Sequence, residues 1–257
     1  MILHTTDIGQ GTPTILLHGL FGTGSNFATI QRHLATTRRV LAFDLRNHGR
    51  SPHDPVMTYP AMAQDVRDTM RALGIEAAAL VGHSMGGKVA MTLALHDPAS
   101  VTRLLVADIA PVAYPPRYDT IVAAMRGLAL PADLTRADAD SRLATAIPDP
   151  VMRQFLLSNL RFGAQPEWRI GLDEIAASLP VIMGWPKTGN GVSDGAGRFE
   201  GPTLVLRGER SDYILPEHRP LFRALFPAAR FAALRDAGHW LHADAPDAFT
   251  ATLNAFL

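Results

Sequence analysis

A serine stands between two glycines in the segment Gly82-His83-Ser84-Met85-Gly86. The segment follows the apolar run 77–81 and precedes the stretch 87–91, so a strand, a tight turn and a helix are expected in that order. A serine in such a turn is exposed at the end of its strand, beside the free N–H groups of the helix N-terminus. The glycines are needed because the turn brings two stretches of backbone into contact. The pattern predicts that Ser84 is a nucleophile.

A serine hydroxyl is a weak nucleophile and needs a base within hydrogen-bonding distance. His239, in Asp236-Ala237-Gly238-His239-Trp240, follows the last expected strand. Loops that follow parallel strands meet at one edge of the sheet, where Ser84 is also expected. The order serine, then histidine, is that of hydrolases. His242 is the alternative base, and His83 is expected to point away from the partners of Ser84.

The base needs an acid to orient it, and two aspartates are candidates. Asp108 ends the expected strand 104–108, and Asp212 follows the expected strand 203–207. Both lie at the same sheet edge as Ser84. Aspartates also begin loops at strand ends for local reasons, so the residues alone leave both candidates open.

Hydrolysis through a tetrahedral intermediate also needs N–H donors for the developing oxyanion. One is expected from the backbone of Met85, the residue after the nucleophile. The other is expected from the loop His18-Gly19-Leu20-Phe21-Gly22, with Leu20 as the first candidate and Phe21 as the second.

Further residues are candidates for contact with a substrate. The expected pocket residues are Phe21, His83, Trp168, Trp185 and Trp240. Lys88 would lie in the first turn of the nucleophile helix, where a cation is unfavourable, so it is expected to pair with a carboxylate or to reach an anionic substrate group. Arg46 and His48 could contact substrate or form an ordinary turn.

Strands and helices alternate along most of the chain, which predicts a mostly parallel sheet with crossover helices. The expected strands are 14–18, 39–44, 77–83, 104–108, 203–207 and 230–234. Helices are expected up to about residue 34, over 59–73, from Ser84 to about 96, after Pro216 and from Pro246. An α/β fold with helices on both faces of the sheet follows.

Residues 113–200 interrupt this alternation with helical patterns and no convincing strand. We expect them to form a helical lid, inserted between the sixth and seventh strands, and residues 1–112 and 201–257 to form the core. The aromatic and methionine side chains of the lid favour an apolar acyl group, although most of them are also expected to bury the lid on the core. The glycine-rich segment 187–201 is a candidate gate for the site.

Composition excludes several classes of protein. The formal net charge is zero and no basic run is present, so nucleic acids and anionic membranes are not expected partners. The chain has no cysteine, which excludes disulfides and thiol nucleophiles. No signal peptide or membrane span is evident, and we expect a cytoplasmic protein. No metal-ligand cluster or phosphate-binding loop is present, so no metal or organic cofactor is expected.

The motifs together resemble the α/β-hydrolase superfamily and, more narrowly, the YbfF-like esterases. The resemblance runs nearly the whole length of the chain and rests on His18–Gly22, Asp44–Ser51, Gly82–Lys88, Asp108–Pro111 and Gly238–Trp240. It implies a serine carboxylesterase acting on short- to medium-chain acyl esters. An acyl-thioesterase or another small-molecule serine hydrolase is the alternative, and a non-catalytic binding protein is a second one.

The resemblance also bears on the acid. In the common superfamily pattern the acid stands three residues after the glycine that ends the seventh strand, and this position is Ser211 here. In the similar esterases the aspartate of the sixth strand matches, which implies that Asp108 is the acid. Asp212 remains the alternative.

Overall fold

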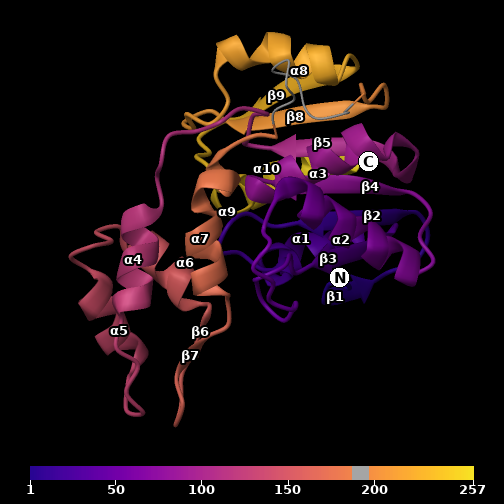
Figure 1. The fold of residues 1–257 in the computed structure, drawn as a ribbon. Coiled ribbons are helices and arrows are strands. Elements are labelled where there is room, and N and C mark those ends of the chain that lie inside the picture. Colours follow the sequence, from indigo (N-terminus) through magenta and orange to yellow (C-terminus); the bar gives the residue numbers. More distant parts are fainter. Residues whose placement is uncertain (187–196) are drawn as a thin grey trace.

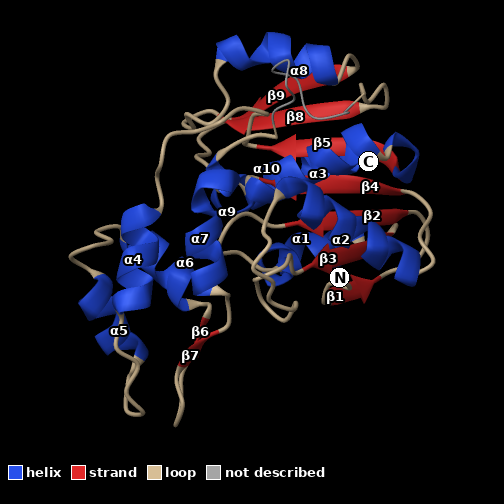
Figure 2. Cartoon of the chain, viewed as in Figure 1, coloured by secondary structure: helices blue, strands red, loops and turns tan. Residues whose placement is uncertain are grey.

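A seven-stranded sheet forms the centre of the molecule (Figures 1 and 2). The computed structural model describes residues 1–186 and 197–257. The strand order is β1-β3-β2-β4-β5-β8-β9, with β1 antiparallel to β3 and every other pair parallel. The strands are β1 (Thr5–Ile8), β2 (Pro13–Leu17), β3 (Arg39–Phe43), β4 (Ala78–His83), β5 (Val101–Ala107), β8 (Thr203–Gly208) and β9 (Ala229–Leu234).

Both faces of the sheet are buried, because neighbouring residues of the central strands point into two separate hydrophobic clusters. Ile15 and Leu80 belong to one cluster, and Leu16 and Val81 belong to the other. The first is covered by α2 (Tyr59–Ala72), α3 (Met85–His96) and α8 (Arg219–Leu225), and the second by α1 (Ala28–Leu34), α9 (Leu241–Asp244) and α10 (Pro246–Phe256). This burial explains why the strands are continuous apolar runs.

The sequence predicts the central strands and crossover helices well but misses the edge of the sheet. Strand β1 was not expected, because Thr5–Ile8 is short, half-exposed and has no apolar run. The insertion was expected after the sixth strand. It follows β5, the fifth strand along the chain, so that expectation was wrong by one strand. Short 3-10 helices at Gly24–Phe27, Pro98–Ser100 and Pro216–His218 complete the core.

The chain between β5 and β8 forms the inserted segment, whose described residues are 113–186 and 197–200. Its helices gather beside the sheet in Figure 1. They are α4 (Asp119–Gly127), α5 (Arg136–Leu143), α6 (Pro150–Leu157) and α7 (Leu172–Met183). The expectation of no strand here was wrong, since β6 (Leu160–Arg161) pairs with β7 (Glu167–Trp168). Two-residue strands are too short for a recognisable alternation. Residues 187–196 of the expected gate lie outside the described residues.

Lys88 connects α3 to Val112, just before the inserted segment, and to Gly184, directly after α7. Its Nζ donates hydrogen bonds to the carbonyl oxygens of Val112 at 2.9 Å and Gly184 at 2.5 Å. The ammonium also lies 4.8 Å from the ring centroid of Tyr114 and 5.4 Å from that of Tyr59. Among residues 1–186 and 197–257 no carboxylate pairs with this ammonium, and main-chain oxygens and aromatic rings contact it where a carboxylate was expected. Burial lowers the pKa of Lys88 to about 7.

No helix among residues 1–186 and 197–257 has the length and apolar character needed to cross a membrane.

Candidate active site

Ser84 lies in the turn between β4 and α3, with φ +53° and ψ −121°. The turn requires its glycines: a Cβ on Gly82 would lie 2.3 Å from the oxygen of Gly86, and one on Gly86 would lie 2.3 Å from the oxygen of Leu17. The Ser84 N–H donates to the oxygen of Ala107 on the neighbouring strand, at 2.9 Å. The turn therefore holds the serine in a strained conformation at the carboxyl edge of the sheet.

His239 bridges Ser84 and Asp108. Its Nε2 lies 3.0 Å from the Ser84 Oγ, and its Nδ1 lies 2.8 Å from the Asp108 Oδ2. Because a carboxylate only accepts, the proton belongs on Nδ1, and Nε2 is left to accept the serine hydroxyl. The three side chains come from the ends of β4 and β5 and from the loop after β9, where parallel strands end at one edge.

Asp108 is fully buried and has its lone pairs engaged. Its Oδ1 accepts from the Gly208 N–H at 3.0 Å, and its Oδ2 accepts from the Ser211 hydroxyl as well as from His239. The alternative acid, Asp212, has a side chain that is 69% exposed and forms an ion pair with Arg117 at 3.0 Å. That hydrogen bonding lowers the pKa of Asp212. Ser211 occupies the position where the common superfamily pattern has the acid, and its hydroxyl donates a hydrogen bond to Asp108.

Two further histidines lie beside His239. The Nε2 of His83 donates to the main-chain oxygen of His239 at 2.8 Å, so the expectation that His83 points away from the partners of Ser84 was wrong. Burial lowers the pKa of His83 well below its ordinary value, which keeps the ring neutral. His242 packs on Phe27, with ring centroids 5.0 Å apart, and its Nδ1 has no hydrogen-bond partner among the described residues. Among the described residues His239, and not His242, forms the hydrogen bond to Ser84.

The two expected oxyanion donors come from different parts of the chain, Leu20 from the loop after β2 and Met85 from the start of α3. The N–H groups of Leu20 and Met85 donate no hydrogen bond within the described part of the chain, and both residues border cavities that contain Ser84. The Phe21 N–H, in contrast, is engaged, because it donates to the Nε2 of His48 at 3.1 Å. The geometry therefore favours Leu20 over Phe21 as the second donor.

His48, expected either to contact substrate or to form an ordinary turn, does not border the cavity in front of Ser84 and instead supports the loop that carries Leu20. Its Nδ1 lies 2.9 Å from the oxygen of Arg46, to which it donates, so its Nε2 is free to accept from Phe21. Burial lowers the pKa of His48 to about 3, which keeps this acceptor available at neutral pH. Phe21 has φ +62°, a conformation that needs support from its surroundings. His48 thus holds the loop that carries Leu20.

A cavity of about 270 Å³ opens in front of Ser84 and His239. Of the expected pocket residues, Phe21, His83 and Trp240 line it. Trp168 does not, because its Nε1 donates to the oxygen of Met125 at 3.2 Å within the inserted segment. Trp185 packs near Tyr59 instead, with ring centroids 6.4 Å apart. Phe27, Ile121, Met152 and Phe155 were missed, since apolar side chains at helical spacing carry no signal that separates a pocket from a core.

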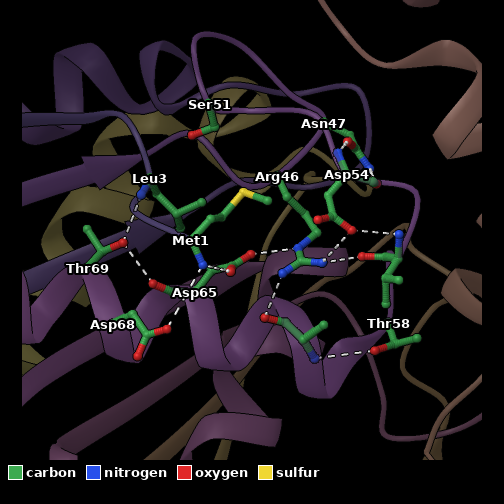
Figure 3. A network of polar contacts seen from close by, with 12 residues as sticks. Met1, Leu3, Arg46, Asn47, Ser51, Asp54, Thr58, Asp65, Asp68 and Thr69 are labelled. Atoms are coloured by element: carbon green, nitrogen blue, oxygen red, sulfur yellow. Dashed lines mark hydrogen bonds and ion pairs between the residues drawn. The ribbon is translucent and has the colours of Figure 1, made fainter.

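Arg46, a candidate for substrate contact, is buried in a polar network away from the cavity (Figure 3). Its Nε donates to the Asp65 Oδ2 at 2.6 Å, and its terminal nitrogens donate to the main-chain oxygens of Val56 and Ala61. Arg46 therefore fixes the loop between β3 and α2. Among residues 1–186 and 197–257, no group of three or more acidic or histidine side chains is arranged to hold a metal ion.

Residues 12–246 match the family model described as the alpha/beta hydrolase fold. The chain belongs to the α/β-hydrolase family. The α/β-hydrolase fold expected from the sequence is thereby confirmed, with the corrections to strand count given above.

Named relatives place this α/β hydrolase more narrowly. Esterase YbfF of Escherichia coli is 37% identical over 249 residues, which cover 96% of this chain and 94% of the relative. The sn-1-specific diacylglycerol lipase ABHD11 of Mus musculus is 41% identical over 252 residues, covering 95% and 80%. A solved marine microorganism esterase superposes with a TM-score of 0.94 at 35% identity, covering 100% of this chain and 99% of the other. The predictions of a YbfF-like hydrolase and of a carboxylic ester hydrolase are confirmed.

Proposed function

We propose that this α/β hydrolase is a serine carboxylesterase in which Ser84 is the nucleophile, His239 the base and Asp108 the orienting acid. The observation that carries the proposal is the continuous chain of hydrogen bonds from Ser84 through His239 to Asp108, at 3.0 and 2.8 Å. The N–H groups of Leu20 and Met85, which donate to no acceptor among residues 1–186 and 197–257, complete the set of groups that acyl transfer needs.

In the first step the Ser84 Oγ attacks the ester carbonyl carbon while His239 takes the hydroxyl proton on Nε2. The Leu20 and Met85 N–H groups stabilise the oxyanion, and Asp108 stabilises the imidazolium. The intermediate then collapses as the carbon–oxygen bond to the alcohol breaks. His239 returns its proton to the departing oxygen, and the acyl group remains on Ser84.

In the second step water attacks the acyl-enzyme, and His239 takes a proton from it. Collapse of the second intermediate breaks the bond from the acyl carbon to the Ser84 Oγ, His239 returns its proton to that oxygen, and the carboxylic acid leaves. Every proton moves through the one imidazole, so no metal or organic cofactor is required by this sequence of steps.

The substrate class we propose is a small-molecule ester with apolar groups, of short to medium acyl length. The apolar walls of the cavity support the apolar character of the substrate, and the inserted segment, as a lid over the core, supplies several of these walls. No feature of the site favours thioesters over oxygen esters. A cytoplasmic location stays part of the proposal.

Covalent labelling tests the function directly. A fluorophosphonate probe should label the protein at Ser84, and Ser84→Ala should abolish both labelling and hydrolysis of 4-nitrophenyl acetate. Ester hydrolysis by Ser84→Ala at the parental rate would refute the proposed nucleophile, and a folded parent that hydrolyses no ester would refute the function.

A further inference from the structure

Two cavities meet at Ser84. The large cavity has a volume of about 270 Å³ and the small cavity about 20 Å³, so the first is more than ten times larger. Leu20, Ser84, Tyr118 and Tyr213 border both of them. An ester bound with its carbonyl carbon at the Ser84 Oγ therefore has two unequal spaces for its two sides.

His239 borders only the large cavity. In acyl transfer the protonated base gives its proton to the departing oxygen, so the alcohol side of the ester must lie next to the imidazole. The acyl side then points away from His239. In this site the space on that side of Ser84 is the small cavity, bordered by Met85, Ile109 and Met183.

We propose that the small cavity is the acyl site and the large cavity the alcohol site, so that the enzyme selects acetate and similarly short acyl esters of larger apolar alcohols. The inference rests on the proposed function and deepens it, because it states which side of the ester each cavity takes.

The size of the small cavity limits the acyl group. A volume of about 10–15 Å³ on this scale holds one water molecule. The small cavity, at about 20 Å³, thus has room for little more than one methyl group beyond the carbonyl. Acetyl fits this space without rearrangement, and each further methylene group requires movement of the walls.

The walls of the small cavity are held by polar contacts. The Tyr59 hydroxyl donates to the oxygen of Ile182 at 2.5 Å, and the Tyr114 hydroxyl donates to the oxygen of Tyr213 at 2.7 Å. Lys88, which also borders the cavity, donates to the main-chain oxygens of Val112 and Gly184. Expansion of the cavity would break buried hydrogen bonds, which opposes binding of longer acyl chains.

The large cavity has the opposite character. Its apolar walls come from Phe21, Phe27, Ile121, Met152, Phe155 and Trp240. Phe21 and Trp240 lie in loops, which offer more freedom to adapt than a wall held by buried hydrogen bonds. An extended or ring-containing alcohol can bury its apolar surface there.

Two isomeric esters test the assignment. Hexyl acetate and ethyl hexanoate contain the same atoms and differ in the side of the ester that carries the long chain. We expect kcat/KM for hexyl acetate to exceed that for ethyl hexanoate at least about tenfold, since one excess methylene group in an apolar pocket already costs about that factor. Equal values, or a preference for ethyl hexanoate in pH-stat assays, would overturn the assignment.

A matched pair of variants tests the same point from the protein side. Met183 borders only the small cavity and Met152 only the large one, and both are half-buried methionines of the inserted segment. Met183→Ala should raise the ratio of kcat/KM for ethyl hexanoate to that for ethyl acetate about tenfold. Met152→Ala should leave this ratio unchanged. The opposite pattern would overturn the assignment, and Met183→Val provides the test if the alanine variant is unstable.

Fluorophosphonate labelling of Ser84 separates the two levels of failure. A parent enzyme that labels and hydrolyses both isomers equally refutes the cavity assignment and leaves the esterase function intact. A folded protein that neither labels nor hydrolyses any ester refutes the function itself.

Discussion

The ring of Tyr213 stacks on the imidazole of His239, with centroids 3.8 Å apart and planes inclined by 17°. The Tyr213 hydroxyl lies 2.8 Å from that of Tyr118, and the Tyr213 oxygen accepts from the Tyr114 hydroxyl at 2.7 Å. Contacts to the inserted segment thus fix the tyrosine, and the tyrosine limits rotation of the histidine. Asp108 holds the imidazole at its Nδ1, on the ring edge, and Tyr213 packs against a face of the ring.

Loss of this support should impair catalysis more than binding. Tyr213→Leu removes the ring, and we expect kcat to fall about 10- to 100-fold, because small displacements of a catalytic group have effects of this order. Tyr213→Phe keeps the ring and should retain most of the activity. Steady-state kinetics with 4-nitrophenyl acetate distinguishes the two, with circular dichroism to verify folding. Equal activity of the two variants would contradict a positioning role.

Asp108 and Asp212 provide a direct comparison of the two candidate acids. Asp108→Asn should lower kcat by about 10⁴-fold, since an amide favours the wrong tautomer of the histidine. Asp212→Asn breaks only an exposed ion pair with Arg117, and such pairs contribute about 0–1 kcal/mol to stability. Its activity should stay close to that of the parent. The reverse order of activities would identify Asp212 as the acid.

His48 should affect the oxyanion loop without touching the substrate. His48→Leu leaves the Phe21 N–H buried without an acceptor, at a cost of about 1–3 kcal/mol, and should displace the Leu20 donor. We expect kcat to fall by up to about 10²-fold with little change in KM, as for loss of an oxyanion donor. His48→Gln offers an amide oxygen as acceptor and should recover part of kcat. Equal effects of both substitutions would show that the acceptor is not what matters.

Buried neutral histidines should make the protein sensitive to acid. The pKa is lowered to about 3 for His48 and to about 4 for His242, in both mainly by burial, against an ordinary value of 6.5. Below pH 6.5 the unfolded chain takes up these protons and the folded protein does not, so stability falls as the pH decreases toward 4. Each histidine contributes about 1.4 kcal/mol per pH unit in this window.

Urea unfolding at pH 7, 6 and 5 measures this slope. His48→Gln should reduce the loss of stability between pH 7 and 5 by about 2 kcal/mol, most of it below pH 6, because it removes one of the titrating groups. The exposed His33, replaced by glutamine, provides the matched control. A slope that is the same in the His48 variant and in the parent would contradict the linkage.

The sequence predicts the residues of the site that depend on local patterns. Ser84 is marked by glycines that a sharp turn requires, and His239 by its position after a strand of a parallel sheet. Strand position alone left Asp108 and Asp212 both open as the acid, and only the family resemblance favoured Asp108. Topology brings the ends of these strands together, so residues far apart in the chain could be expected to meet. The structure places the three side chains in hydrogen-bonding contact.

Residues that depend on tertiary packing could not be predicted in this way. Trp168 and Trp185 have the same side chain as Trp240, but only the orientation of the inserted segment decides which tryptophan reaches the cavity. Tyr213 follows Asp212 directly, and nothing in the pattern separates a ring stacked on His239 from an ordinary loop residue. Within the part of the chain that the structure describes, Lys88 pairs with carbonyl oxygens where a carboxylate was expected, and no local pattern could have foretold this.

The contacts of Lys88 have a consequence for how the molecule can change over evolution. One ammonium group joins the carbonyl oxygen of Val112, just before the inserted segment, and that of Gly184, within it, to the helix that begins after Ser84. Exchange of the chain between these two residues, with Lys88 and its two carbonyl acceptors kept, would preserve the reactive groups and replace the cavity walls that Ile121, Met152 and Phe155 supply, so new specificity could arise by grafting of this part.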